Sequence, residues 1–151
     1  MSKIKGFKTS IEKIGFHSVK EIEFTDRDKE IGFYEMKNFS IDRDRNLLIP
    51  YIKESLKINP KLKIWSCPWS PPYWMKTSDE MCGGGELIDT PENLRAYAKY
   101  LVKYIQAYKS EGIDICGFCV QNETDVVNVY PTSTMTAEMM QKFIRAYLIQ
   151  S

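Results

Sequence analysis

One acidic residue of the sequence has a setting that could support acid–base chemistry. Val120-Gln121-Asn122-Glu123 closes a compact apolar segment, so Glu123 would leave the end of a strand beside the amide of Asn122. Partial burial disfavours the charged form of a carboxyl group, which lets such a group donate a proton near neutral pH. An amide at this place can hold a substrate hydroxyl. Asn-Glu is also a common dipeptide, and without further support a solvated loop pair explains it better.

Support comes from an aromatic segment that follows another apolar run. Residues 65–76 read Trp-Ser-Cys-Pro-Trp-Ser-Pro-Pro-Tyr-Trp-Met-Lys, and three prolines fix the backbone that carries the aromatic rings. Such rings stack on the apolar faces of sugars. The competing interpretation is a loop that only fills the core.

Helices and short strands alternate along the part of the sequence that carries these segments. A helix is expected from Ser40 or Asp42 towards Asn59, with an apolar face that includes Leu47 and Tyr51. Pro50 lies inside this stretch, so the alternative is a regular helix that begins near it. Further elements are a strand to Cys67, a helix from Pro91 with Thr90 as its cap and Gly112 at its end, a strand over residues 113–120, and a last helix capped by Thr134 or Thr136. This order implies a parallel sheet in which long loops at the carboxyl ends of the strands carry function.

The two chemical segments, in this order and with a helix between them, resemble family 30 of the glycoside hydrolases. Glucosylceramidases and β-1,6-glucanases belong to that family, whose catalytic domain is a (β/α)8 barrel. The resemblance covers roughly residues 33–148. It implies that Glu123 is the acid/base, that Asn122 holds the sugar hydroxyl next to the anomeric carbon, and that Trp69 lines the glycone subsite. It also implies that Trp74 supports the loop rather than touching sugar.

The sequence departs from this family in three places. The family usually has proline after the Asn-Glu pair, where this chain has Thr124, and a substrate-binding Asp expected near residues 14–18 is missing. A retaining mechanism needs two carboxyl groups about 5–5.5 Å apart. The second of these, the family's nucleophilic Glu, belongs to a later strand than any recognised here. The fold is therefore predicted to be α/β, a fragment of a TIM (β/α)8 barrel from roughly the second to the fourth βα unit. Residues 1–32 would form a poorly defined N-terminal segment, and residues 33–151 the partial family 30 domain.

The resemblance implies a retaining glycoside hydrolase that acts on a β-glucoside or a glucosylceramide-like substrate, in carbohydrate or sphingolipid metabolism. This chain would carry its acid/base half and would need neither a metal nor an organic cofactor. The alternative is a truncated, inactive fragment that binds carbohydrate weakly. Open strand edges predict aggregation of the chain by itself, so a complementary C-terminal fragment is a further candidate partner.

Composition and charge bear on the kinds of partner and the location expected for this chain. Lys and Arg number 21 against 20 Asp and Glu, and this balance gives no reason to expect a nucleic-acid partner. No apolar stretch is long enough to span a membrane. No signal peptide is recognised, and four cysteines without a framework spacing are read as free thiols. A cytoplasmic location is therefore expected for the chain as given, although family members are often secreted or lysosomal.

Three weaker sequence signals are interpreted as features without a catalytic or ligand-binding role. Cys116 and Cys119 form a C-x-x-C, but residues three apart in a strand point to opposite faces, which excludes a shared disulfide or zinc ion. The glycines at 83–85 lack the Lys-Ser/Thr of a phosphate-binding loop and predict a flexible rim. His17 has no partner pattern for catalysis.

Overall fold

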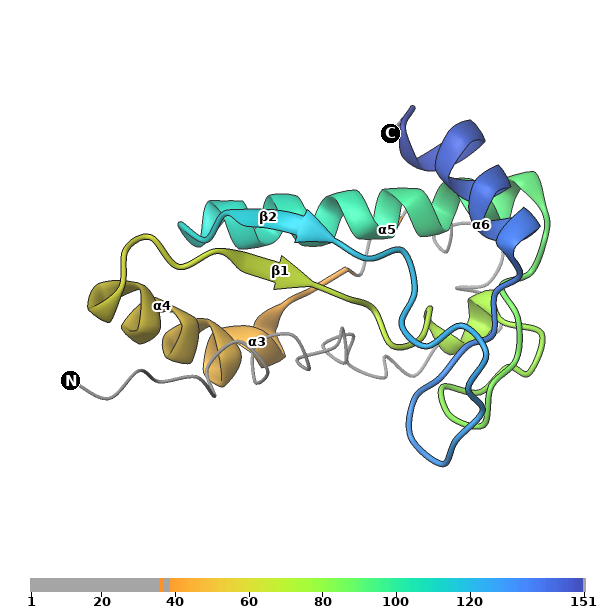
Figure 1. Cartoon of the computed structure of the whole chain (residues 1–151), viewed down its shortest axis with the longest axis horizontal. Coiled ribbons are helices and arrows are strands. Elements are labelled where there is room, and N and C mark those ends of the chain that lie inside the picture. The colour runs from red at the N-terminus through yellow and green to blue at the C-terminus, as the bar shows by residue number, and fades with distance from the viewer. Residues whose placement is uncertain (1–35, 37–38, 151) are drawn as a thin grey trace.

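The computed structural model describes Met36 and residues 39–150 (Figure 1). The segment 1–32, including His17, lies outside these residues. The elements follow one another as α3 (Asp42–Asn46), α4 (Leu48–Ile58), β1 (Ile64–Ser66), η1 (Tyr73–Met75), α5 (Pro91–Ser110), β2 (Ile115–Phe118), α6 (Ala137–Phe143) and the π-helical η2 (Ile144–Leu148).

The two strands are parallel neighbours, as the alternating pattern predicts. Ile64 pairs with Ile115, but Trp65 pairs with Gly117, so a β-bulge leaves Cys116 without a partner in β1. Helix α5 connects the strands and runs alongside them, and the long loops gather at the carboxyl ends of β1 and β2 (Figure 1). This is the arrangement of one βαβ unit of a TIM barrel.

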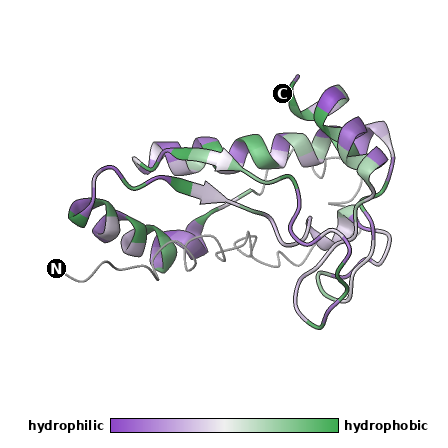
Figure 2. Cartoon of the chain, viewed as in Figure 1, coloured by the Kyte–Doolittle hydropathy of each residue, from purple (hydrophilic) through white to green (hydrophobic). Residues whose placement is uncertain are grey.

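Helix α5 begins and ends where its sequence predicts. The Thr90 hydroxyl accepts a hydrogen bond from the Asn93 amide at 3.3 Å, Pro91 is the first helical residue, and Gly112 takes a φ of 79° after the last turn. Polar and apolar residues alternate around the helix (Figure 2). The residues of α5 that are buried in the core include Leu94, Tyr97, Ala98, Tyr100, Leu101, Tyr104 and Tyr108.

The stretch over residues 40–59 is divided at Leu47 into α3 and α4. A single helix over this stretch is therefore wrong, and the alternative of a helix that begins near Pro50 is confirmed. Leu47 is 67% exposed and Tyr51 44% exposed, whereas Ile49 and Ile52 are buried. Pro50 accounts for the change. It lacks an amide hydrogen and is tolerated only in a first helical turn, so a new helix begins at Leu48. That restart rotates the apolar face away from Leu47.

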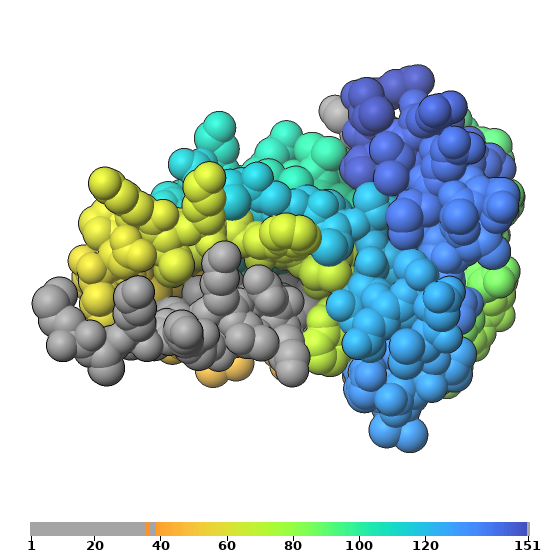
Figure 3. Space-filling view, in the orientation of Figure 1, coloured from red at the N-terminus to blue at the C-terminus, as the bar shows by residue number. Residues whose placement is uncertain are grey.

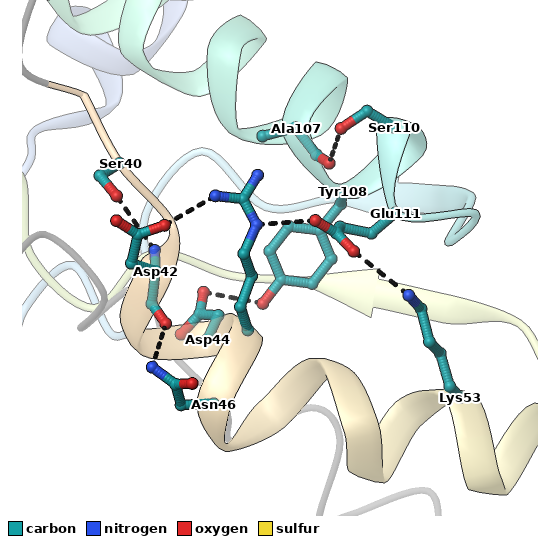
Figure 4. Close-up of polar contacts among 10 residues, drawn as sticks. Ser40, Asp42, Asp44, Asn46, Lys53, Ala107, Tyr108, Ser110 and Glu111 are labelled. Carbon is teal, nitrogen blue, oxygen red and sulfur yellow. Dashed lines mark hydrogen bonds and ion pairs between the residues drawn. The ribbon is translucent and has the colours of Figure 1, made fainter.

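A polar junction fastens α3 and α4 to the carboxyl end of α5 (Figure 4). Glu111 accepts from Arg45 Nε at 2.7 Å and from Lys53 Nζ at 3.2 Å, and these hydrogen bonds lower the pKa of Glu111. The Tyr108 hydroxyl donates to the buried Asp44 Oδ2 at 2.8 Å. Helix α3 therefore connects to α5 through side-chain hydrogen bonds as well as through the apolar core.

The last helix lies across the end of α5 where the loops gather (Figure 1). Of its two candidate caps, Thr136 is used, since its hydroxyl accepts from the Met139 amide at 3.1 Å. Phe143 is fully buried with its ring 5.2 Å from that of Tyr97. Among the described residues, no helix has the length and apolar character needed to cross a membrane.

Candidate active site

The carboxyl ends of β1 and β2 are joined by hydrogen bonds that run from the residues around Asn122. The Asn122 amide donates to the Pro68 carbonyl at 3.0 Å, and Gln121 Nε2 donates to the Trp69 carbonyl at 2.8 Å. Gln121 is buried, and its Oε1 accepts no hydrogen bond from the described residues. Gln121 thus sets the distance between the aromatic loop and the acidic residue, a role that its place in the sequence did not reveal.

Glu123 and Trp69 lie in one site, with Tyr130 between them. The Tyr130 hydroxyl donates to Glu123 Oε2 at 3.3 Å, while the Tyr130 ring lies 5.6 Å from the Trp69 ring at an interplanar angle of 56°. The residues after β2 lie at the surface of the end where the loops gather (Figure 3). Tyr130 was not predictable from the sequence, because no local pattern marks one aromatic residue within a loop of this length.

Glu123 is exposed, whereas the sequence analysis expected partial burial. The residue lies in the loop after β2, beyond the end of the sheet. Its backbone has a φ of 41°, in the left-handed region that a residue with a Cβ seldom occupies. Such strain is often kept where a side chain must point in one direction.

Asn122 and the two tryptophans of the loop differ in their surroundings. Asn122 is half-buried, and its Oδ1 accepts a hydrogen bond from the Cys67 thiol at 3.7 Å. Trp69 is half-buried beside Tyr130, with part of its surface open to a ligand. Trp74 is half-buried and packs against the hydrophobic core, as support of the loop requires.

Lys76 joins the loop after β1 to the loop after β2. Its side chain is 2% exposed, and its ammonium group donates to the carbonyls of Glu80, Met81 and Thr132 at 2.7, 3.2 and 2.8 Å. Burial lowers the pKa of this ammonium group. Three carbonyl oxygens around one buried cation hold the two loops in a fixed relation.

The glycines at 83–85 are part of this contact, because the amides of Gly83 and Gly84 donate hydrogen bonds to the loop after β2. The Gly84 amide donates to Thr132 Oγ1 at 3.0 Å, and all three glycines have a positive φ. A Cβ on Gly84 would lie 2.8 Å from a methyl group of Val127. Glycine is therefore needed here for close packing of the two loops.

The chemistry available to this arrangement is that of one carboxyl group beside an amide and an aromatic pair. Among residues 39–150 and Met36, no three His, Cys, Asp or Glu side chains are grouped so that they could hold a metal ion. The carboxyl group can exchange a proton with a ligand, the Asn122 amide can bond to a hydroxyl, and the rings of Trp69 and Tyr130 offer apolar faces.

Comparison with known proteins gives consistent matches. Residues 11–149 match the Glycosyl hydrolase family 30 TIM-barrel domain. A Caenorhabditis elegans protein named "Putative glucosylceramidase 3" is 36% identical over 121 residues, 76% of this chain and 23% of its own length. The lysosomal acid glucosylceramidase of Mus musculus is 31% identical over 94 residues, 60% of this chain and 18% of its own length.

A solved structure extends the match to three dimensions. The endo-β1,6-glucanase BT3312 superposes with a TM-score of 0.71 and 33% sequence identity, covering 89% of this chain and 30% of that protein. The present chain spans about a quarter of the length of the worm relative. The chain belongs to glycoside hydrolase family 30, and residues 39–150 fold as part of that family's TIM-barrel domain.

Proposed function

We propose that this chain supplies the acid/base part of a retaining β-glycosidase, with Glu123 as the proton donor. The observation that carries the proposal is the meeting of Glu123, Tyr130 and Trp69 at the carboxyl ends of two parallel strands. Ligands of TIM barrels bind at these ends. In the complete reaction, Glu123 would protonate the glycosidic oxygen, and its carboxylate would then activate water.

The nucleophile would come from another part of the barrel. A retaining mechanism needs a second carboxyl group about 5–5.5 Å from the first. One face of the two-stranded sheet is partly uncovered at Trp65 of β1, which is 48% exposed. A polypeptide that carries the remaining strands would cover this ring, and it is the partner we propose for this chain.

The substrate would be a β-linked glucoside. Glucosylceramidases and an endo-β1,6-glucanase are among the related proteins. Both activities named there act on β-glucosidic bonds, and an aromatic pair beside the acid suits the apolar face of a glucose ring. Glucosylceramide-like lipids and β-glucan oligosaccharides are the two substrate types to test first.

The role of Glu123 is tested by measuring the hydrolysis of aryl β-glucosides. The assay uses the longest protein that the gene encodes, and chain 1–151 is measured in parallel. Glu123→Gln keeps the shape of the side chain but removes the acid, so we expect kcat to fall roughly 10²–10⁴-fold with a poor leaving group. A dinitrophenyl leaving group needs no proton, so cleavage of its glycosyl bond should be affected much less. Asp125→Asn, a change at an exposed carboxylate two residues away, should leave both rates unchanged.

A second function, carbohydrate binding without turnover, is favoured by one observation. The Trp69 and Tyr130 rings are in contact whether or not a second carboxyl group is present. Titration of chain 1–151 with a β-glucoside, followed by tryptophan fluorescence, distinguishes the cases. Binding that survives Glu123→Gln in a chain without measurable hydrolysis would support the binding function. If neither binding nor hydrolysis is measured, both functions are excluded for this chain.

A further inference from the structure

Two cysteines of the described chain meet at the foot of the candidate active site. Cys67 follows β1 directly and Cys119 follows β2 directly. The strands pair Trp65 with Gly117 and Ser66 with Phe118, so the next pair in register is Cys67 with Cys119. The bulge at Cys116 causes this pairing, since an unbulged β2 would place Phe118 opposite Cys67.

The backbone between the two cysteines supports the same pairing. The Cys119 amide donates to the Ser66 carbonyl at 2.9 Å, as the parallel ladder requires. The next bond of the ladder would run from residue 68 to the Cys119 carbonyl. Pro68 has no amide hydrogen, so the ladder stops at this point. The two cysteines thus lie next to each other in the last register of the sheet, where the backbone is least constrained.

We infer that Cys67 and Cys119 form a dithiol that closes to an intrachain disulfide by exchange with a low-molecular-weight disulfide. Neighbouring strands lie about 4.7–4.9 Å apart, and a disulfide needs a Cα separation of about 4.4–6.8 Å. Paired residues of a parallel sheet also direct their side chains to the same face. The pairing differs from the C-x-x-C of the sequence, whose Cys116 is an exposed residue of β2.

The surroundings of the two thiols assign their roles in the exchange. Burial raises the pKa of the Cys67 thiol to about 12, and the charge of Cys119, a hydrogen bond with it and the charge of Glu123 add to the effect. Cys119 is half-buried and is the thiol that a reagent reaches first. Since the thiolate is the attacking form, Cys119 is the attacking residue and Cys67 the resolving one.

The exchange is balanced with oxidised glutathione as the oxidant. The Cys119 thiolate attacks one sulfur of glutathione disulfide, and one glutathione thiolate leaves. Cys67 then loses its proton and attacks the Cys119 sulfur of the mixed disulfide, and the second glutathione leaves. Two electrons pass from the protein dithiol to the glutathione disulfide, and the two thiol protons end on the two released glutathione molecules.

The disulfide would also change the site above it. The Cys67 thiol donates a hydrogen bond to Asn122 Oδ1, and Cys67 loses this donor when its sulfur is oxidised. Asn122 is the amide proposed to hold a sugar hydroxyl. The dithiol itself requires no hydrolytic activity, so its test is independent of the proposed function.

Two double variants of the full chain give the test. Cys82→Ser with Cys116→Ser removes both exposed thiols and keeps the inferred pair, while Cys67→Ser with Cys119→Ser keeps the exposed ones. Each protein is incubated with oxidised glutathione, its free thiols are alkylated, and the products are analysed by intact mass and peptide mapping. Circular dichroism before oxidation shows whether each variant is folded like the unmutated chain, which is measured alongside.

We expect the variant that keeps Cys67 and Cys119 to lose both free thiols while it remains a monomer. Its mass should be lower by about 2 Da, and the peptide map should contain a peptide that links the two residues. The control should gain glutathione mass without closing. A mixed disulfide that persists in the first variant, or two thiols that still alkylate, would overturn the inference. If the serine changes disturb folding, the peptide map of the unmutated chain decides, because a link between Cys116 and Cys119 contradicts the inference and one between Cys67 and Cys119 supports it.

Discussion

The Tyr130 hydroxyl donates a hydrogen bond to Glu123 Oε2 at 3.3 Å while its ring lies against Trp69, 5.6 Å away between centroids. One residue of the loop after β2 therefore connects the proposed acid to the proposed sugar platform. The two contacts can be separated by substitution, since phenylalanine keeps the ring and removes the hydroxyl.

We expect Tyr130→Phe to weaken β-glucoside binding less than about tenfold, because the ring contact with Trp69 is kept and only an exposed hydrogen bond within the protein, worth about 0.5–1.5 kcal/mol, is lost. Tyr130→Ala should weaken it further, because it also removes the aromatic contact, worth about 0.5–1.5 kcal/mol. Titration followed by tryptophan fluorescence measures both. Tyr51→Phe, on α4, is the control. Equal affinities of Tyr130→Ala and the unmutated chain would show that the ring has no part in binding.

The positive φ of Glu123 predicts an unusual order of stabilities at this position. Glycine adopts a positive φ without the clash that a Cβ causes, so Glu123→Gly should be more stable than Glu123→Ala by about 1 kcal/mol. Urea unfolding of the two variants measures the difference. Asp125 has no positive φ, so there the alanine variant should be the more stable one. The same order at both positions would show that the backbone at Glu123 is unstrained.

The structure clarifies which parts of the site are predictable from sequence. Glu123, Asn122 and Trp69 follow apolar runs, and the carboxyl ends of parallel strands meet, so their proximity follows from the pattern alone. Tyr130 and Lys76 acquire their roles from contacts between two loops. No periodicity governs such contacts, and the sequence therefore carries no local signal for them.

The secondary structure likewise contains features that local sequence signals predict and features that they do not. Thr90 and Gly112 are strong local signals, and α5 begins and ends beside them. The break at Leu47 depends on where Pro50 falls within a helical turn, which an apolar count cannot determine. The bulge at Cys116 is likewise a property of the pairing of two strands, and it places Cys119 rather than Phe118 opposite Cys67.

Lys76 should contribute strongly to stability, although it is a buried charge. Lys76→Met leaves the carbonyls of Glu80, Met81 and Thr132 without their shared donor, and we expect a loss of roughly 2–4 kcal/mol in the free energy of unfolding. Limited proteolysis should cut the loop at residues 77–86 faster. Lys99→Met, on the exposed face of α5, should change neither quantity. If both variants unfold alike, the ammonium group does not hold the loops together.

Glu111 gives a prediction about pH, because hydrogen bonds from Arg45 and Lys53 lower its pKa in the folded chain. A carboxyl group with a lowered folded pKa stabilises the fold above its unfolded pKa, about 4.3, and this contribution is lost as the pH falls through the folded pKa. Glu111→Gln should therefore unfold at a lower urea concentration than the unmutated chain at neutral pH. The difference should shrink in acid and also at high salt, which screens the exposed parts of the junction. Glu86→Gln, at an exposed position, is the matched control. A deficit of Glu111→Gln that persists unchanged in acid would mean that it comes from packing rather than from the charge of Glu111.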